Sequence, residues 1–140
     1  MLTPVTLADR LRVAVGRLAR RLRQQSLGGL TPSQSSILAT LDRHGPMTMS
    51  RLAQYEAVAK PSATGIVGRL FDKGLVVREP DPEDGRSSIV AISPEGVAAL
   101  EARRRERTAY LARRIETLSD ADRAVLERAA ELFELMIEDR

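Results

Sequence analysis

Two short runs of β-branched and apolar residues interrupt a chain whose other apolar residues follow helical spacing. The first run is residues 75–79 (LVVRE), and the second is residues 89–92 (IVAI). A polar segment rich in Pro, Asp, Gly and Ser separates them, which predicts a β-hairpin with a charged tip. No other segment predicts a strand, so the expected fold is mainly helical with one small hairpin.

Helices are predicted from apolar periodicity and from their end signals. Residues 7–25 predict an amphipathic helix with an Arg-rich opposite face, which ends in the segment 26–30 (SLGGL). The sequence TPSQ at 31–34 predicts a helix start, because Thr caps, Pro suits the first turn and Gln can close a capping box. Further starts near residues 49, 60, 93 and 119 bring the prediction to six helices.

Residues 48–92 together predict a winged helix-turn-helix. A short helix at 49–56 is followed by a tight connection and by a second helix that begins at Lys60. A helix that enters the major groove of DNA needs small or polar residues on its exposed face. The predicted exposed residues are Ser62, Thr64, Gly65, Gly68 and Arg69, and the predicted buried ones are Ala63, Val67, Leu70 and Phe71. The hairpin is then the wing, and Arg86 at its acidic tip suits a narrow minor groove, although an ordinary surface Arg is the alternative.

Three motifs resemble the MarR (multiple antibiotic resistance regulator) family. They are LFDKGLV at residues 70–76, PDPEDGR at 80–86 and ISPEG at 92–96. They match the family's L-x-x-x-G-L stretch, its D-x-R wing and its [ST]-x-x-G helix start. Helix order and chain length also agree over nearly the whole chain. The resemblance implies one domain of residues 1–140, in which dimerisation helices at 1–30 and 115–140 flank a winged unit at 31–92 and a connecting helix at 93–118.

The resemblance also implies a function. Members of the family are homodimers that repress transcription at near-palindromic operators and release the DNA when a small aromatic or phenolic anion binds. Arg86 is then expected to enter the minor groove and Asp84 to fix the wing. Many members carry Arg where this chain has Gly65, so base readout is expected to be weaker or to shift to Arg69 and the wing. The predicted DNA-binding residues are Lys60, Pro61, Ser62, Thr64, Gly65, Arg69, Arg78, Asp84 and Arg86.

Dimerisation and effector binding are both assigned to the terminal helices. The apolar faces of these helices are larger than the winged unit can cover, so the helices are predicted to pack against a second copy across a two-fold axis. The predicted dimerisation residues are Leu11, Leu126, Leu132, Phe133 and Met136. Arg17 and Arg21 lie one turn apart and are predicted to bind the carboxylate of an aromatic ligand where the first helix passes the start of the long one. Exposed ion pairs or phosphate contacts explain these two Arg residues equally well.

Composition excludes several kinds of site. The chain contains no Cys, which excludes disulfides, thiolate metal sites and Cys nucleophiles. Its single His, His44, stands beside a Gly-Pro pair and no cluster of carboxylates accompanies it, so neither a metal nor a cofactor is expected. Six Arg residues and one acid, Asp9, give residues 1–30 a net charge of +5. The pI of the whole chain, about 9.9, is compatible with nucleic-acid binding, and the base composition of the genome is the alternative explanation for so many Arg residues.

Two other functions stay open from the sequence. One is an Arg-rich helical enzyme that binds an anionic substrate through Arg17, Arg21 and Arg113, although no paired acid and base suggests catalytic residues. The other is an architectural DNA-binding protein without an effector. The run RRRER at 103–107 predicts a solvated helix face. No membrane span or signal peptide is apparent, so a cytoplasmic protein is expected.

Overall fold

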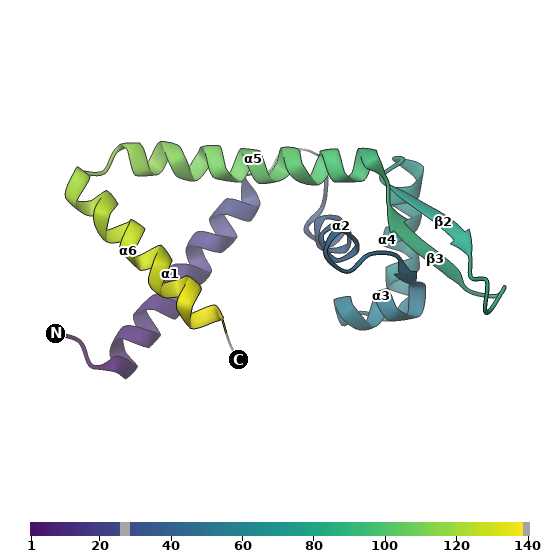
Figure 1. The fold of residues 1–140 in the computed structure, drawn as a ribbon, viewed down its shortest axis with the longest axis horizontal. Coiled ribbons are helices and arrows are strands. Elements are labelled where there is room, and N and C mark those ends of the chain that lie inside the picture. Colours follow the sequence, from purple (N-terminus) through teal and green to yellow (C-terminus); the bar gives the residue numbers. More distant parts are fainter. Residues whose placement is uncertain (26–28, 139–140) are drawn as a thin grey trace.

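A computed structural model describes residues 1–25 and 29–138 of the chain. The elements in this part are α1 (Pro4–Gln24), α2 (Pro32–His44), β1 (Met47–Thr48), α3 (Met49–Glu56), α4 (Lys60–Asp72), β2 (Val76–Pro80), β3 (Ser88–Ile92), α5 (Pro94–Glu116) and α6 (Asp120–Ile137). The mainly helical fold with a small β wing is therefore confirmed. Helix α5 runs from the winged unit to the far end of the molecule, where α1 and α6 lie (Figure 1).

Side-chain caps explain where the helices begin. Thr31 accepts the N–H of Gln34 while the Gln34 side chain accepts the N–H of Thr31, so the predicted capping box is present. Helix α1 starts three residues before the predicted residue 7, because Thr3 caps it and Pro4 occupies the first turn. This is the same Thr-Pro signature that predicted α2, but the apolar period of α1 begins only at Leu7. The helix ends at Gln24, and residues 26–28 of the predicted stop signal lie outside the described residues.

The sheet contains one strand more than predicted. Its order is β1-β3-β2 and both pairings are antiparallel, with Met47 opposite Val90 and Val76 opposite Ile92. Strand β1 is only two residues long, too short to display an alternating pattern. Pairing with β3 makes it a strand, and that pairing joins residues some forty positions apart in the chain.

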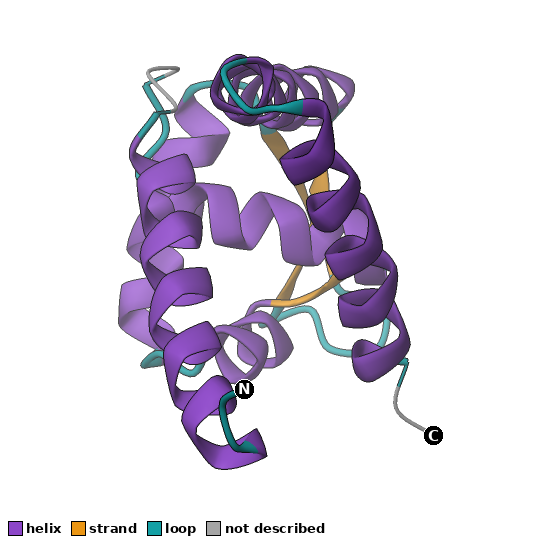
Figure 2. Cartoon of the chain, turned by 90° about the vertical axis from the view of Figure 1, so that its left-hand side faces the viewer, coloured by secondary structure: helices purple, strands orange, loops and turns teal. Residues whose placement is uncertain are grey.

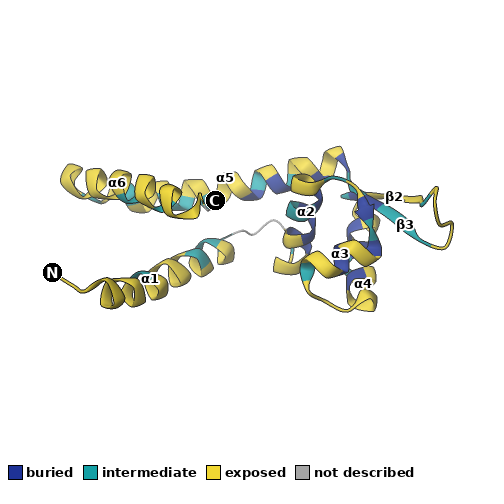
Figure 3. Ribbon diagram, turned by 60° about the horizontal axis from the view of Figure 1, so that its bottom comes forward, coloured by how far each residue is buried: buried dark blue, intermediate teal, exposed yellow. Residues whose placement is uncertain are grey.

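The apolar core lies within the winged unit. It consists of Ile37, Leu38, Leu41, Met47, Met49, Leu52, Ala53, Ala63, Val67, Leu70, Val76, Val90 and Leu100. In contrast, neither α1 nor α6 contains a buried residue (Figure 3). They form separate arms: α1 leads from the N-terminus towards α5, and α6 follows α5 and leads to the C-terminus (Figure 2). None of the helices in the described ranges is both long and apolar enough to cross a membrane.

The prediction that Phe71 is buried is wrong. The side chain is 43% exposed, whereas its neighbour Leu70 is fully buried. Successive residues of a helix point about 100° apart, so both cannot face the core at the end of α4. The guanidinium of Arg78 covers part of the Phe71 ring instead, with 4.3 Å between the guanidinium carbon and the ring centroid.

Candidate nucleic-acid interface

The connection between α3 and α4 is a tight left-handed turn. Ala57 has φ 54° and ψ 42°, and the N–H of Val58 donates to the carbonyl of Ala53 at 3.1 Å. This arrangement is a helix C-cap in which Gly is the usual residue. The turn leads directly into α4, so α3 and α4 form the two helices of a helix-turn-helix.

Helix α4 separates its residues into a buried and an exposed face. Ala63, Val67 and Leu70 are buried against the core. The exposed residues include every predicted contact on this helix, namely Lys60, Pro61, Ser62, Thr64, Gly65 and Arg69, while Gly68 is half-buried. The Thr64 hydroxyl donates to the carbonyl of Lys60 at 2.9 Å and keeps its lone pairs as acceptors. Residues 60–71 contain no acidic side chain, so nothing on this segment repels an approaching phosphate.

The N-terminus of α4 lacks the side-chain cap that the other helices have. Ala59 occupies the cap position and its methyl group accepts no hydrogen bond. The first N–H groups of a helix have no acceptor within the helix and form the positive end of its dipole. At an exposed helix start, such N–H groups favour a bound phosphate or another anion.

The tip of the wing is held by its own hydrogen bonds. The Asp84 carboxylate accepts the N–H of Arg86 at 3.1 Å, and the N–H of Ser87 donates to the carbonyl of Asp84 at 3.0 Å. The N–H of Asp81 closes the loop by donating to the carbonyl of Ser87. Arg86 is exposed, and no acidic side chain of residues 1–25 and 29–138 forms a salt bridge with it. Arg78, also predicted to bind DNA, lies on β2 against the Phe71 ring.

Arg17 and Arg21, the predicted effector ligands, line an open hollow between α1 and the last turns of α5, so the prediction that α1 passes the start of the long helix here is wrong. The hollow measures about 430 Å³, and Tyr110 and Arg114 of α5 complete it. The guanidinium carbon of Arg114 lies 5.1 Å from the centroid of the Tyr110 ring. Arg113, which the enzyme hypothesis placed with Arg17 and Arg21, is not among the lining residues.

The prediction that residues 103–107 form a solvated face is wrong for Arg103. This side chain is only 4% exposed and donates to the carbonyl of Leu30 at 3.0 Å and to that of Arg23 at 3.5 Å. Burial lowers the pKa of Arg103, and the neighbouring Arg107 lowers it further. Charge spacing along one helix could not reveal this, because the end of α1 and the start of α2 bury the residue.

The predicted dimerisation residues remain largely uncovered within one chain. Leu126, Leu132 and Met136 are exposed, and Leu11 and Phe133 are half-buried. The stripe on α6 continues through Val125, Leu135 and Ile137, which are also exposed. Apolar patches of this kind mark interaction surfaces when they are continuous.

A helix-turn-helix with an exposed polar second helix and a projecting wing defines a winged helix-turn-helix DNA-binding protein. Residues 30–88 match the MarR family. The chain is 41% identical over 134 residues to an HTH-type transcriptional regulator of Mycobacterium leprae, covering 95% of this chain and 94% of that protein. It is 36% identical over 104 residues to the HTH-type transcriptional repressor NicR of Pseudomonas putida, covering 74% of this chain and 63% of that one. The chain therefore belongs to the MarR family of HTH-type transcriptional regulators.

A solved structure agrees with this assignment. The crystal structure of a putative transcriptional regulator from Pseudomonas aeruginosa superposes with a TM-score of 0.80 at 30% identity, covering 97% of both chains. The family match and the similar relatives confirm the predicted family. Since the family consists of transcriptional regulators, the hypothesis of an Arg-rich helical enzyme is wrong.

Proposed function

We propose that this regulator is a sequence-specific repressor that binds a near-palindromic operator as a homodimer and releases it when a small aromatic anion binds. The observation that carries the proposal is the exposed start of α4, which is polar, free of acidic side chains and without a side-chain cap. NicR, a transcriptional repressor, matches 74% of this chain, whereas BadR, a transcriptional activatory protein, matches 49%, which favours repression over activation.

In this proposal α4 enters the major groove and the wing follows the adjacent minor groove. Lys60, Pro61, Ser62 and Thr64 meet the DNA at the start of α4, and Arg69 reads from its second half. Asp84 holds the loop at the tip of the wing in place, and Arg86 projects from this loop. The loop therefore does not have to be ordered when the Arg86 guanidinium enters the minor groove, which lowers the entropic cost of binding. Gly65 offers no side chain, which leaves base readout to these neighbours.

The dimer is proposed to form through the helices of residues 1–30 and 115–140. A partner helix would cover the exposed stripe on α6 and the apolar face of α1, which the chain itself leaves uncovered. The residues proposed to pack there are Leu11, Leu126, Leu132, Phe133 and Met136. Two copies of α4 would then read half-sites about 34 Å apart, one turn of B-DNA.

The aromatic anion is proposed to bind in the hollow formed by Arg17, Arg21, Tyr110 and Arg114. A guanidinium can pair bidentately with a carboxylate and stack on an aromatic ring, and the hollow supplies three guanidinium groups beside one phenol. The ligand weakens DNA binding only if it binds more tightly to a conformation of the dimer in which the spacing of the two α4 helices does not match the half-sites of the operator.

The DNA-binding part is tested by selecting duplexes from a random pool and measuring affinity by fluorescence anisotropy. The expected result is a two-fold symmetric site whose affinity falls steeply with salt, because phosphate contacts release counterions. Arg86→Ala should weaken binding by about 1–3 kcal/mol, mainly at A·T-rich flanks. Arg105→Ala is the matched control, since it removes the same charge from an exposed position on α5. Unchanged affinity of Arg86→Ala at every salt concentration would contradict the wing assignment.

The effector part is tested by calorimetry with salicylate-like compounds on the wild type and on the Arg17→Ala/Arg21→Ala variant. Binding is expected only to the wild type, and the bound ligand should weaken the DNA complex. If DNA binding is specific but no such compound weakens it, the chain is an effector-independent architectural DNA-binding protein instead.

A further inference from the structure

The turn between α4 and β2 is a rigid extension of α4. The N–H of Gly74 donates to the carbonyl of Phe71 at 2.9 Å. The N–H of Leu75 donates to the carbonyl of Leu70 at 3.0 Å. With Gly74 at φ 74°, these two hydrogen bonds form a Schellman motif, a common way for a helix to end at a glycine. The backbone of Gly74 and Leu75 is therefore fixed relative to α4.

Ser93, the N-cap residue of α5, binds both carbonyl groups of this turn. Its hydroxyl donates to the carbonyl of Gly74 at 2.6 Å, and its N–H donates to the carbonyl of Leu75 at 3.0 Å. The same hydroxyl accepts the N–H of Gly96 at 3.0 Å and so caps α5. Ser93 is only 3% exposed, so water competes little for these hydrogen bonds. One residue thus connects the end of α4 to the start of α5.

Gly96 allows α5 to lie as close to the turn as it does. The residue is buried in the first turn of α5. A Cβ atom at this position would overlap the carbonyl oxygen of Leu75 and lie 2.8 Å from Cγ1 of Ile92. The Leu75 oxygen belongs to the backbone of the Schellman turn, so it cannot rotate away as the end of a long side chain can. Glycine is needed here for a close approach of two backbones.

These contacts bring together two of the sequence motifs. Gly74 and Leu75 belong to the segment LFDKGLV, whereas Ser93 and Gly96 belong to ISPEG. The whole wing separates the two segments in the chain. Neither the DNA interface nor the effector hollow of the proposed function uses any of these four residues, which we call the α4–α5 joint.

The position of the joint makes its angle important for DNA recognition. Helix α5 runs from the joint to the end of the molecule where α1 and α6 lie (Figure 1). Helix α4 has 13 residues and is therefore about 20 Å long. A rotation of about 10° at its end displaces its start by roughly 3.4 Å, which is the rise of one base pair. A small change of angle is therefore enough to move α4 out of register with a half-site.

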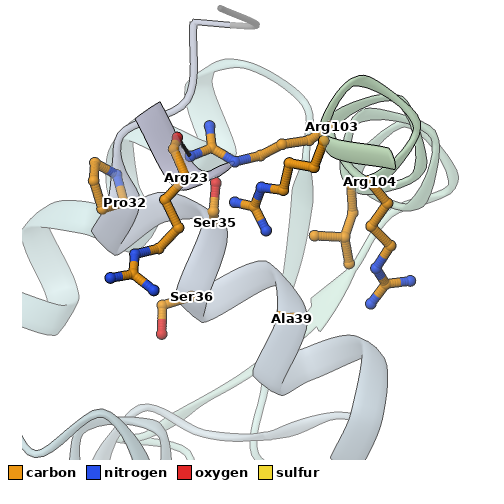
Figure 4. A pocket seen from close by; sticks show the side chains of 9 residues that line it. Arg23, Pro32, Ser35, Ser36, Ala39, Arg103 and Arg104 are labelled. Atoms are coloured by element: carbon orange, nitrogen blue, oxygen red, sulfur yellow. Dashed lines mark hydrogen bonds between the residues drawn. The ribbon is translucent and has the colours of Figure 1, made fainter. Parts of the chain in front are cut away.

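We propose that Ser93 and Gly96 are positioning residues, which fix the angle between α4 and α5 and thereby set the half-site spacing that the homodimer reads. The spacing rests on the proposed function, whereas the fixed angle is a property of a single chain. Helix α5 has a second contact with the winged unit, where Arg103 extends towards the start of α2 and donates to the carbonyl of Leu30 (Figure 4). That contact holds α5 against the start of α2, whereas the joint holds the end of α4.

The angle is tested without DNA by the distance between two spin labels in one chain, measured by pulsed electron paramagnetic resonance. The chain contains no Cys, so Ser62→Cys on α4 and Arg105→Cys on α5, both exposed, can be labelled selectively. Dilution with unlabelled protein restricts the measurement to pairs within one chain. We expect one narrow distance in the otherwise unchanged protein, and a shift of at least 3 Å or a clearly broader distribution in Gly96→Ala. Identical distributions would overturn the proposal.

Ser93→Ala is the second variant, and it decides the question if Gly96→Ala does not fold. It removes the hydrogen bond to Gly74 and the cap of α5 without adding an atom, and it should broaden the same distribution. Glu56→Ala is the control for a general loss of stability, because Glu56 ties α3 to α2 rather than α4 to α5. An equal change in Glu56→Ala would show that the distance reports loosened packing, and would refute the role of the joint.

The half-site spacing is tested on duplexes whose selected half-sites are separated by spacers that differ by one base pair. The wild type should prefer one spacer at least tenfold over its neighbours, because each added base pair also rotates one half-site by about 36°. Gly96→Ala, or Ser93→Ala in its place, should reduce this preference at least threefold or favour another spacer. Its affinity for a duplex with a single half-site should stay within twofold of the wild type, since α4 itself is unchanged.

The outcomes separate this inference from the proposed function. An equal loss of affinity at every spacer would refute the spacing role of the joint, even though the protein binds its operator. A wild type that binds no duplex would refute the proposed function, and the spin-label distances would still decide whether Ser93 and Gly96 fix the angle.

Discussion

The guanidinium of Arg78 lies 4.3 Å from the centre of the Phe71 ring, which joins the first strand of the wing to the last turn of α4. The wing is thereby oriented relative to the helix proposed to enter the major groove. A cation–π contact at an exposed site contributes about 0.5–1 kcal/mol. A double-mutant cycle of Arg78→Ala and Phe71→Leu should give a coupling of this size in the free energy of unfolding. A coupling of zero would show that the two side chains do not stabilise each other.

Glu56 is expected to be important for stability rather than for DNA recognition. Its carboxylate accepts hydrogen bonds from Ser36 at 2.7 Å and from Thr40 at 2.8 Å, which ties the end of α3 to α2. Hydrogen bonds to a charged acceptor are stronger than average, so Glu56→Ala should lower the free energy of unfolding by about 1.5–3 kcal/mol. Glu79→Ala, on the exposed face of β2, should change it by less than about 0.5 kcal/mol. Similar losses in chemical denaturation of both variants would contradict the role of Glu56.

Gly65 is expected to limit both helix stability and base readout. A Cβ atom at this position would meet nothing within 4 Å, so Ala fits without a clash. Gly65→Ala should raise the free energy of unfolding by about 1 kcal/mol. Gly65→Arg should in addition change the base preference at one position of each half-site, with Gly65→Ala as the control for helix stability. Identical selected sequences for both variants would mean that residue 65 does not face the bases.

Leu132 and Val97 provide a matched pair for testing the dimer. Both are helical and similarly exposed within one chain, at 42% and 37%. If a partner covers Leu132, then Leu132→Asp buries an unpaired carboxylate at a cost of several kcal/mol. Sedimentation should then show loss of the dimer together with loss of operator binding, while Val97→Asp keeps both. A monomeric wild type at micromolar concentration would contradict the dimer and the symmetric operator together.

Local signals in the sequence account for the parts of the fold that were predicted. Gly45 and Gly74 have φ angles of 81° and 74°, and each lies just after the end of a helix, where Gly is the favoured residue. Thr31 and Ser93 cap the helices that their Thr-Pro and Ser-Pro pairs predicted. Such signals are readable because cap, proline and glycine preferences depend only on residues within a turn or two.

The sequence by itself thus determined the starts of the helices from α2 to α6, the wing and the exposed polar face of α4. Only the tertiary structure decided that β1 forms, that Phe71 is exposed and that Arg103 is buried. Residues 47 and 48 become a strand by pairing with β3, and Phe71 is kept near the surface by the turn of α4 and by Arg78. Arg103 is buried because the end of α1 and the start of α2 pass over one face of α5. Each outcome depends on segments that lie far apart in the chain, and periodicity within one segment contains no information about what will cover it.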